Sequence, residues 1–283
     1  MQNLTRLIRE AKTGNSTDQQ LQNMIREYLQ VLILKAIYQS KYGSSLSFIG
    51  GTCLRICYNL RRYSEDLDFA LDRKPHKYSF KELNEIIAGY LKYTDFEVDL
   101  SIQEEKTVQK SFIRVGRIMH FFGLSKLKSQ KLHVKLEIDT NPVYVIDKEI
   151  ETFFVTKFDE NFPILKHTDD TLFAGKICAA LNCTYTKGRD FYDLIWYLNK
   201  GTKINFRYLN KAFVRAGFKQ QFKDEREVVN RLDEKIRIVD VKDIFRDVNR
   251  FLEDSGEEKW VNDYPVAFRQ AAKHFLELKL KNP

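Results

Sequence analysis

The sequence has no long uncharged apolar run among its 283 residues. A membrane-spanning helix needs about 20 consecutive, mostly apolar residues, so we expect no membrane span. The N-terminal stretch MQNLTRLIREAKTGN mixes charged residues with its apolar ones, which is not the pattern of a secretory signal. We therefore expect a globular protein of the cytoplasm, and its 43% hydrophobic residues are enough for a sizeable core.

Cysteine and histidine are scarce, and neither follows the spacing of a metal site. The 4 cysteines form no paired CxxC motif, and the 5 histidines form no HxxxH or HxH pair. We therefore expect buried thiols and no histidine-built metal site. No GxxxxGK[ST] motif is present, which excludes a P-loop kinase. The cysteines are Cys53, Cys57, Cys178 and Cys183.

Basic residues exceed acidic ones, at 47 against 39, for a formal net charge of +8. This surplus permits an anionic partner but does not name one. Arg61 and Arg62 form one basic cluster, and Lys126, Lys128 and Lys131 form another in SKLKSQK. On charge alone, a solvated surface is the simpler explanation of such clusters.

The periodicity of the chain changes near residue 160. After the helical segment DQQLQNMIREYLQVLILKAIYQSKY, strand-like runs alternate with turns: LSFIGG, LDFAL, FEVDLSIQ, SFIRVGRIMHF, KLHVKLEID and ETFFVTKF. Past Pro163 the spacing becomes helical, as in TLFAGKICAALN, DFYDLIWYLNK, VKDIFRDVNRFLED and YPVAFRQAAKHFLELKL. We predict an α+β lobe with N-terminal helices over residues 1–160 and a mostly helical lobe over residues 161–283.

The stretch FIGGTCLRICYNL predicts a buried strand, a glycine turn and a helix that Thr52 caps. Gly50 and Gly51 would let the backbone approach a ligand closely. A helix N-terminus offers N–H groups and a positive dipole to a phosphate. Taken alone, two glycines are also compatible with an ordinary turn.

The acidic residues that follow strengthen the phosphate interpretation. In SEDLDFAL the strand period of two places Asp66 and Asp68 on one face, while Leu67 and Phe69 point to the core. Two adjacent carboxylates repel each other unless a cation joins them, and such oxygen ligands suit Mg²⁺ that also binds substrate phosphates. Ser64 lies on the same face, where its hydroxyl can contact or accept a phosphate. The alternative is an ordinary solvent face.

The strand VKLEID carries a candidate third carboxylate. Its alternation turns Val134, Leu136 and Ile138 to the core, so that Glu137 and Asp139 share the other face. Either acid would help to hold a second metal ion or accept the proton of an attacking hydroxyl. The sequence does not choose between the two, and a solvated strand face is the alternative.

A helical segment farther along the chain supplies candidate phosphate ligands. In GKICAALN, Lys176 is the point charge that would stabilise a leaving pyrophosphate. In GRDFYDLIWYL, Arg189 is placed to fork onto a phosphate, and Asp190 either caps the following helix or takes part in the site. Asp193, one turn on, is expected to tie this helix to its neighbours.

These motifs together resemble those of a known family. GGT followed by SEDLDF resembles the signature of the nucleotidyltransferase superfamily related to DNA polymerase β. The form GGTCLR…RYSEDLDF is more similar to the AbiEii family of type IV toxin–antitoxin and abortive-infection systems. VKLEIDTNP and GKICAALNCTYTKGRDFYDLIWYL agree, so the resemblance spans about residues 30–200. Gly51–Thr52 stands where many superfamily members have Gly-Ser.

The resemblance implies a nucleotidyltransferase fold with a mixed sheet and a toxin of phage defence. The enzyme would use Mg²⁺, or Mn²⁺, to transfer an NMP from an NTP to an RNA, in particular the 3′ end of a tRNA, and release pyrophosphate. A cognate antitoxin would neutralise it. A small-molecule or protein acceptor, or a non-catalytic binding module of this fold, are the alternatives. The predicted catalytic residues are Asp66, Asp68, Glu137, Asp139, Lys176 and Asp190; the nucleotide-binding residues are Gly50, Gly51, Thr52, Ser64, Lys176 and Arg189; and the metal ligands are Asp66 and Asp68.

Overall fold

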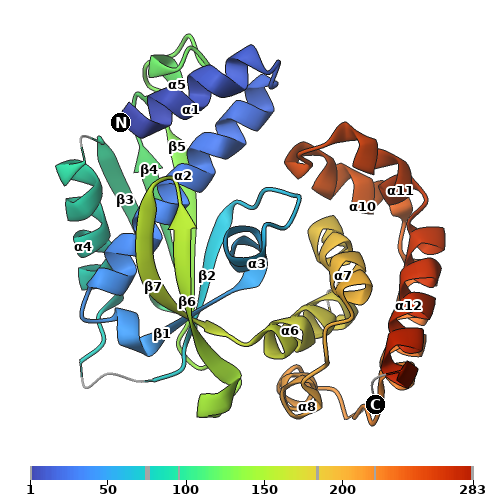
Figure 1. The fold of residues 1–283 in the computed structure, drawn as a ribbon. Helices are drawn as coiled ribbons and strands as arrows, with labels where there is room; N and C mark the ends of the chain where they lie inside the picture. The colour runs from blue at the N-terminus through green and yellow to red at the C-terminus, as the bar shows by residue number, and fades with distance from the viewer. Residues whose placement is uncertain (1, 74–76, 95, 183–184, 220, 282–283) are drawn as a thin grey trace. The chain divides into compact units, whose positions relative to one another are not determined.

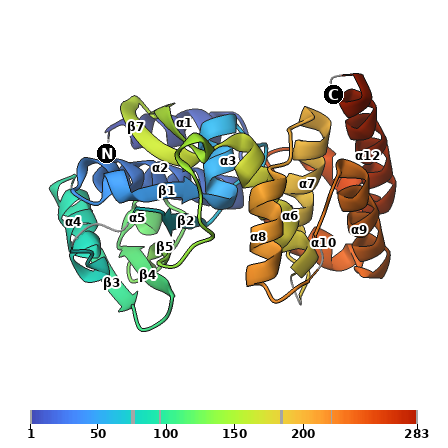
Figure 2. The ribbon, with the colours of Figure 1, turned by 90° about the horizontal axis from the view of Figure 1, so that it is seen from below.

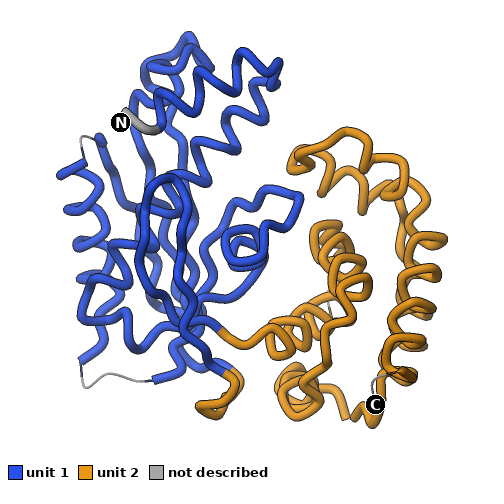
Figure 3. Tube along the Cα trace, viewed as in Figure 1, with its two compact units in different colours: residues 1–142, 150–166 blue, residues 143–149, 167–283 orange. Residues whose placement is uncertain are grey.

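A computed structural model of the protein describes residues 2–73, 77–94, 96–182, 185–219 and 221–281 (Figure 1). The chain divides into two compact units, drawn in different colours in Figure 3. Unit 1 contains residues 1–142 and 150–166, and unit 2 contains residues 143–149 and 167–283. The chain therefore enters unit 2 briefly, returns to unit 1 for two strands, and leaves it again. The division into domains 1–160 and 161–283 stays a prediction.

Unit 1 is built on a mixed seven-stranded sheet in the order β3-β4-β5-β2-β1-β7-β6. Strands β1 and β2 are antiparallel, and β2 and β5 are parallel. Strand β4 runs antiparallel to both β5 and β3. The predicted α+β fold is thereby confirmed. The strands are β1 Leu46–Ile49, β2 Asp66–Leu71, β3 Val98–Gln103, β4 Val108–Val115, β5 Leu132–Asp139, β6 Ile150–Lys157 and β7 Glu160–His167.

Helices cover one face of this sheet. The helices of unit 1 are α1 Gln2–Thr13, α2 Asp18–Gln39, α3 Gly50–Tyr58, α4 Phe80–Tyr93 and the short α5 Ile118–Phe121. Helix α2 contacts β5, and α4 contacts β3 and β4 (Figure 1). Asn84 of α4 accepts a hydrogen bond of 2.6 Å from Ser111 of β4, which identifies the face that α4 covers. Leu67, Phe69, Leu136 and Ile138 are buried, as predicted.

Local sequence explains where these helices begin. Thr17 and Gln20 form a capping box at the start of α2, and Ser79 caps α4 through the backbone N–H of Glu82. Fourteen residues of α2 are buried, which fits its low amphipathicity: this helix packs against α1, α4 and the sheet.

From α6 onward, unit 2 is built of helices that pack against one another (Figure 2). Helix α7 contacts α6, α10 and α12, while α6 also contacts α8 and α9. The helices are α6 Asp169–Asn182, α7 Gly188–Lys200, α8 Phe206–Arg215, α9 Glu225–Ile238, α10 Val241–Val248, α11 Glu258–Asn262 and α12 Tyr264–Lys281. The 3₁₀ turns among the described residues are η1 Gly43–Ser45, η2 Asp147–Glu149, η3 Asn249–Phe251 and η4 Ser255–Glu257.

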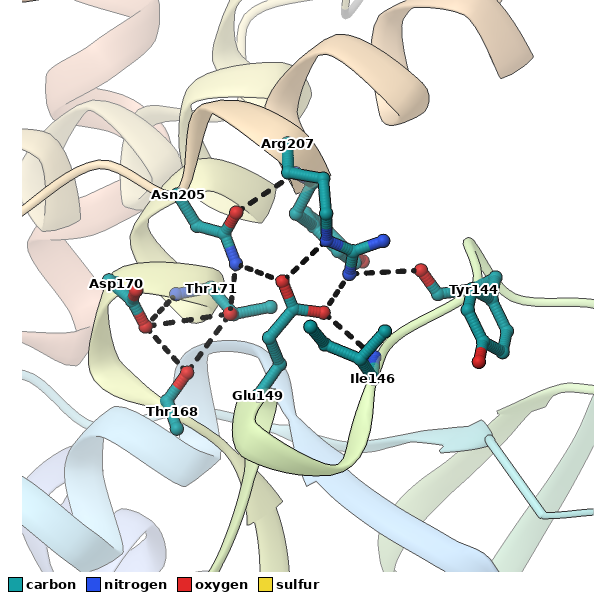
Figure 4. A network of polar contacts seen from close by, with 9 residues as sticks. Tyr144, Ile146, Glu149, Thr168, Asp170, Thr171, Asn205 and Arg207 are labelled. Carbon is teal, nitrogen blue, oxygen red and sulfur yellow. Dashed lines mark hydrogen bonds and ion pairs between the residues drawn. The ribbon is translucent and has the colours of Figure 1, made fainter.

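The buried carboxylate of Glu149 anchors the segment 143–149 to unit 2 (Figure 4). It accepts a hydrogen bond of 2.9 Å from the backbone N–H of Ile146 and one of 2.7 Å from Asn205. Arg207 donates from Nε over 2.8 Å and also from Nη2. Both carboxylate oxygens thus have donors, as a buried charge requires.

Two segments differ from the predicted pattern. The run SFIRVGRIMHF is strand only to Val115, because Arg117 adopts a positive φ of 59° and IMHF forms α5. The chain past Pro163 is not yet helical, because β7 continues to His167. Phe158 and Asp159, with φ of 58° and 62°, form the tight turn between β6 and β7. This turn lacks the usual glycine, so the sequence gives no signal of the hairpin.

The thiols agree only partly with the prediction. Cys53 is buried, while Cys57 and Cys178 are half-buried, and all three are free of disulfide bonds. Cys57 lies in the last turn of α3, and Cys178 lies in α6. Cys183 lies outside the described residues. No helix in the described ranges is long and apolar enough to cross a membrane.

Candidate active site

Asp66 and Asp68 lie on the sheet face opposite to the buried Leu67 and Phe69. Both acids are half-buried, and the side chain of Asp66 is 32% exposed. Asp68 is paired with Ile49, the last residue of β1. The carboxylates therefore stand directly beside the point where β1 ends and the glycine turn begins.

The glycine turn approaches these acids more closely than a side chain would allow. Gly50 has a φ of 79°, and a Cβ atom built on it would lie 2.3 Å from Oδ2 of Asp68. A Cβ atom on Gly51 would lie 2.7 Å from Nη2 of Arg62 and 3.1 Å from Oγ of Ser64. Gly50 is therefore required, because its φ and its contact with Asp68 both exclude a side chain, whereas a side chain at position 51 would force Arg62 to shift.

Thr52 does not cap the helix, contrary to the prediction. Helix α3 already begins at Gly50, and its N-cap residue is Ile49, whose side chain cannot accept a hydrogen bond. Thr52 is buried inside the first turn, where its hydroxyl donates to the backbone carbonyl of Asp66. It thus ties α3 to the first residue of the acid strand. This contact positions the turn against β2 without a cap.

The pairing of β2 with β5 separates the two candidates for the third carboxylate. Glu137 is paired with Asp68, whereas Asp139 is paired with Ala70, one row farther along the sheet. Paired residues of neighbouring strands project from the same face. Asp139 accepts a hydrogen bond of 3.0 Å from the backbone N–H of Asn141 in the following turn. The register thus places Glu137, and not Asp139, beside the acid pair.

Two lysines hold Glu137. Lys135 donates to its Oε2 over 2.7 Å, and Lys110 contacts its Oε1 at 2.8 Å. Burial disfavours the charge of Glu137, but the hydrogen bonds from Lys110 and Lys135 outweigh it and lower the pKa of this carboxyl. Burial would also lower the pKa of Lys135, but Glu137, Asp66 and Asp68 raise it. Glu137 is therefore ionised at neutral pH.

The acid pair provides the chemistry of a divalent-cation site. Asp66 and Asp68 supply hard oxygen donors from one face, which suit a Mg²⁺ ion that takes its other ligands from phosphates and water. Lys135 lies 4.0 Å from Asp66 and partly balances its charge. Within the described ranges, no group of three or more His, Cys, Asp or Glu side chains is arranged as a complete metal site. Asp66 and Asp68 therefore fit a metal ion that takes its remaining ligands from the phosphates of a bound nucleotide.

The remaining predicted residues belong to unit 2, where Lys176 joins two carboxylates. Its Nζ donates to Asp190 over 2.7 Å and contacts Asp193 at 2.8 Å. The side chains of Lys176 and Asp190 are 11% and 13% exposed, and that of Asp193 is fully buried. Asp190 does not cap α7, because this helix begins at Gly188 and its N-cap residue Lys187 makes no side-chain cap. Asp193 ties α7 to α6, as expected.

Arg189 is held by α10 and the turn after it. Its backbone N–H and its Nε both donate to Asp247, over 3.0 and 3.3 Å. Its guanidinium lies 4.7 Å from the ring centre of Phe251. A role in phosphate binding stays a prediction, and it would require Arg189 to exchange at least part of these contacts.

Three basic residues beside the acids were not predicted as site residues. Arg62 is fully buried against the glycine turn, and Lys135 and Lys110 contact Glu137. Alternation alone places Lys135 on the acid face. Lys110 comes from another strand, so only the pairing of β4 with β5 reveals it. For Arg62 the only signal in the sequence is its position shortly before the SEDLDF motif.

Comparisons with known proteins identify the family of the chain and structures of similar fold. The family described as "Nucleotidyl transferase AbiEii toxin, Type IV TA system" matches residues 32–274. The crystal structure of JHP933 from Helicobacter pylori is similar, with a TM-score of 0.55, 18% sequence identity and coverage of 92% of this chain and 96% of that one. MenT4, a nucleotidyltransferase toxin of Mycobacterium tuberculosis, has a TM-score of 0.53, 14% identity and coverage of 95% and 92%. No curated protein sequence matches the chain.

Proposed function

This chain belongs to the AbiEii family of nucleotidyltransferase toxins, and we propose that it transfers an NMP from an NTP to the 3′ end of an RNA, in particular a tRNA. Pyrophosphate is released, and the reaction depends on Mg²⁺, with Mn²⁺ as a substitute. The observation that carries the proposal is the contact between the glycine turn and the acid pair. A phosphate held at this turn lies next to the carboxylates that would hold its counter-ion. A cognate antitoxin in the cytoplasm controls the activity.

In this proposal Asp66 and Asp68 hold the metal ion on the open face of β2. When bound, the ion neutralises the triphosphate and lowers the pKa of the attacking hydroxyl. The first turn of α3, with Gly50 and Gly51, presents backbone N–H groups to the phosphates. Arg62 and Ser64 line the same turn and add a positive charge and a hydroxyl.

The acceptor hydroxyl attacks the α-phosphorus of the NTP. A new P–O bond to the acceptor forms, the bond between the α-phosphorus and the bridging oxygen breaks, and its electron pair leaves with pyrophosphate. Glu137 is ionised and paired in register with Asp68, so it is the carboxylate that receives or relays the proton of the hydroxyl. Lys176 stabilises the charge of the leaving pyrophosphate, while Asp190 and Arg189 support nucleotide binding.

The test is transfer of label from each of the four α-labelled NTPs to purified total tRNA, with and without Mg²⁺. We expect labelled RNA with a preferred nucleotide, and loss of labelling with a chelator. Glu137→Gln and Asp139→Asn form a matched pair: the first should lower turnover strongly, and the second should leave it near that of the wild type. Label on a small molecule or a protein instead of RNA would overturn the RNA acceptor, and no transfer to any acceptor would indicate a binding module.

A further inference from the structure

An aromatic pair lies on the open sheet face, with Phe112 in the same row as Asp66 and His133 in the next row. Phe112 of β4 is paired with Lys135 of β5, which is itself paired with Asp66 of β2. The ring of Phe112 contacts that of His133, with centroids 6.0 Å apart and an interplanar angle of 75°. Phe112 is half-buried and His133 is exposed. An aromatic pair of this kind on a polar face is not needed for the core, which lies on the other side of the sheet.

The charges around this pair are distributed unevenly along the strands. On the side away from the acids, Arg114 is paired with His133, and Lys131 precedes β5. Asp99 of β3 faces both: it bonds Lys131, and it is paired with Arg114. In the opposite direction, the turn between β3 and β4 carries the exposed acids Glu104 and Glu105 together with the exposed Lys106. Arg114 and Lys131 therefore place basic side chains beside the aromatic pair, where a polyanion can contact them.

We propose that Phe112, His133, Arg114 and Lys131 form a stacking surface that binds the single-stranded 3′ end of the acceptor RNA. This inference rests on the proposed function and adds the site at which the acceptor binds. Unpaired bases stack on exposed aromatic rings, whatever their sequence, while basic side chains follow the backbone. The row from Phe112 through Lys135 to Asp66 then leads the terminal hydroxyl toward the acids. A paired duplex cannot use the rings, because its bases are stacked within the helix.

The stacking surface is tested by equilibrium binding in the absence of NTP. The probe is a labelled single-stranded oligoribonucleotide with a free 3′ hydroxyl, compared with the same strand in a blunt duplex. Phe112→Leu removes the aromatic ring but keeps an apolar side chain. It should weaken binding of the single strand by about 5- to 150-fold, the range for loss of one stacked base, and leave duplex binding unchanged. Phe112→Tyr should restore binding.

The control is Tyr93→Leu, which removes a ring that is 89% exposed at the end of α4, on the helix-covered side of the sheet. This variant should bind the single strand as the wild type does. In transfer assays, Phe112→Leu should raise the KM for RNA while kcat and the KM for NTP stay constant.

If the wild type labels tRNA but Phe112→Leu binds the single strand normally, the stacking surface is wrong and the proposed function stands. An equal loss of single-strand and duplex binding would also overturn it. If the wild type labels no RNA, the proposed acceptor itself is wrong.

Discussion

The carboxylate of Glu149 in unit 2 and the carboxylate pair of Asp66 and Asp68 in unit 1 have opposite surroundings. In unit 2, Glu149 is 5% exposed and accepts hydrogen bonds from Ile146, Asn205 and Arg207, so both of its oxygens are occupied. In unit 1, Asp66 and Asp68 stand side by side on a half-buried strand face, and Asp68 lies beside Gly50, where a side chain would not fit. The first arrangement satisfies a charge with protein donors, and the second concentrates like charges.

This difference separates residues that stabilise the fold from residues that act on a ligand. A buried carboxylate with a full set of donors has no capacity left for a substrate. Adjacent carboxylates lower the stability of the free protein through mutual repulsion, and a cation relieves that repulsion. The contrast predicts that a change in the acid pair lowers activity without lowering stability. A change in Glu149 should lower stability without lowering activity.

The largest expected effect is that of Asp68→Asn on transfer. Loss of one metal ligand should lower the rate of NMP transfer by about 10²–10⁴-fold, because charge neutralisation on the phosphates supplies several kcal/mol to this chemistry. The urea midpoint should stay unchanged or rise, since the repulsion between the two acids is removed. Initial rates and equilibrium unfolding on the same preparation provide the measurement. A folded variant with near-normal activity would show that the metal lies elsewhere.

Lys176→Ala should affect both properties. It leaves the fully buried carboxylate of Asp193 without its ammonium partner, which should lower the free energy of unfolding by about 3–5 kcal/mol. Transfer should fall as well, because Lys176 is proposed to stabilise the leaving pyrophosphate. Urea unfolding and the kinetics of NTP use are measured together.

A second variant separates these two effects. Adding Asp193→Asn to Lys176→Ala removes the buried charge that the lysine balanced, so it should recover much of the lost stability but not the transfer rate. If the double variant recovers both, Lys176 acts only in the packing of unit 2.

Glu149→Gln should reduce stability and leave chemistry alone. The amide keeps the shape of the side chain but loses the charge that Arg207 requires, at a cost of about 2–4 kcal/mol, reduced because Arg207 is 31% exposed. Denaturant unfolding gives the cost, and the transfer rate per folded molecule should stay constant. Asp147→Asn, at an exposed position of the same 3₁₀ turn, is the control and should change stability by less than about 0.5 kcal/mol.

The smallest effect is expected from the exposed lysines of SKLKSQK. Replacing Lys126, Lys128 and Lys131 with Gln should reduce the slope of log affinity for single-stranded RNA against log salt by up to about 2, at roughly 0.7 for each phosphate contact. Lys131 should contribute least, because it already bonds Asp99. The KM for NTP should not change. Choice among tRNAs should survive, since phosphate contacts carry no sequence information.

The control for this experiment replaces three exposed lysines of unit 2, Lys242, Lys259 and Lys273, and should preserve the salt slope. Equal changes in both triple variants would show that net charge, and not the SKLKSQK surface, controls binding. If the affinity of the wild type for RNA does not change with salt concentration, a nucleic-acid acceptor is contradicted altogether.

Local patterns in the sequence predicted much of this protein. Alternation placed Asp66 and Asp68 opposite Leu67 and Phe69, because successive side chains of a strand point to opposite faces. The glycines after an apolar run predicted the turn that meets Asp68. The same local reasoning failed for Thr52, which resembles a cap but lies inside the first turn, since nothing in the sequence indicated that α3 would begin at Gly50.

The sequence by itself therefore determined the type and the local periodicity of the elements. It predicted an α+β segment followed by a helical one, two acids on one face of a strand, and glycines at a turn. Only the tertiary structure decided which residues meet. Strand order and register set Glu137, and not Asp139, beside Asp68, and brought Lys110 from β4 onto the same row. The physical reason is that sheet pairing joins residues far apart in the chain. A register shift of one row changes every such neighbour while the pattern within each strand stays the same.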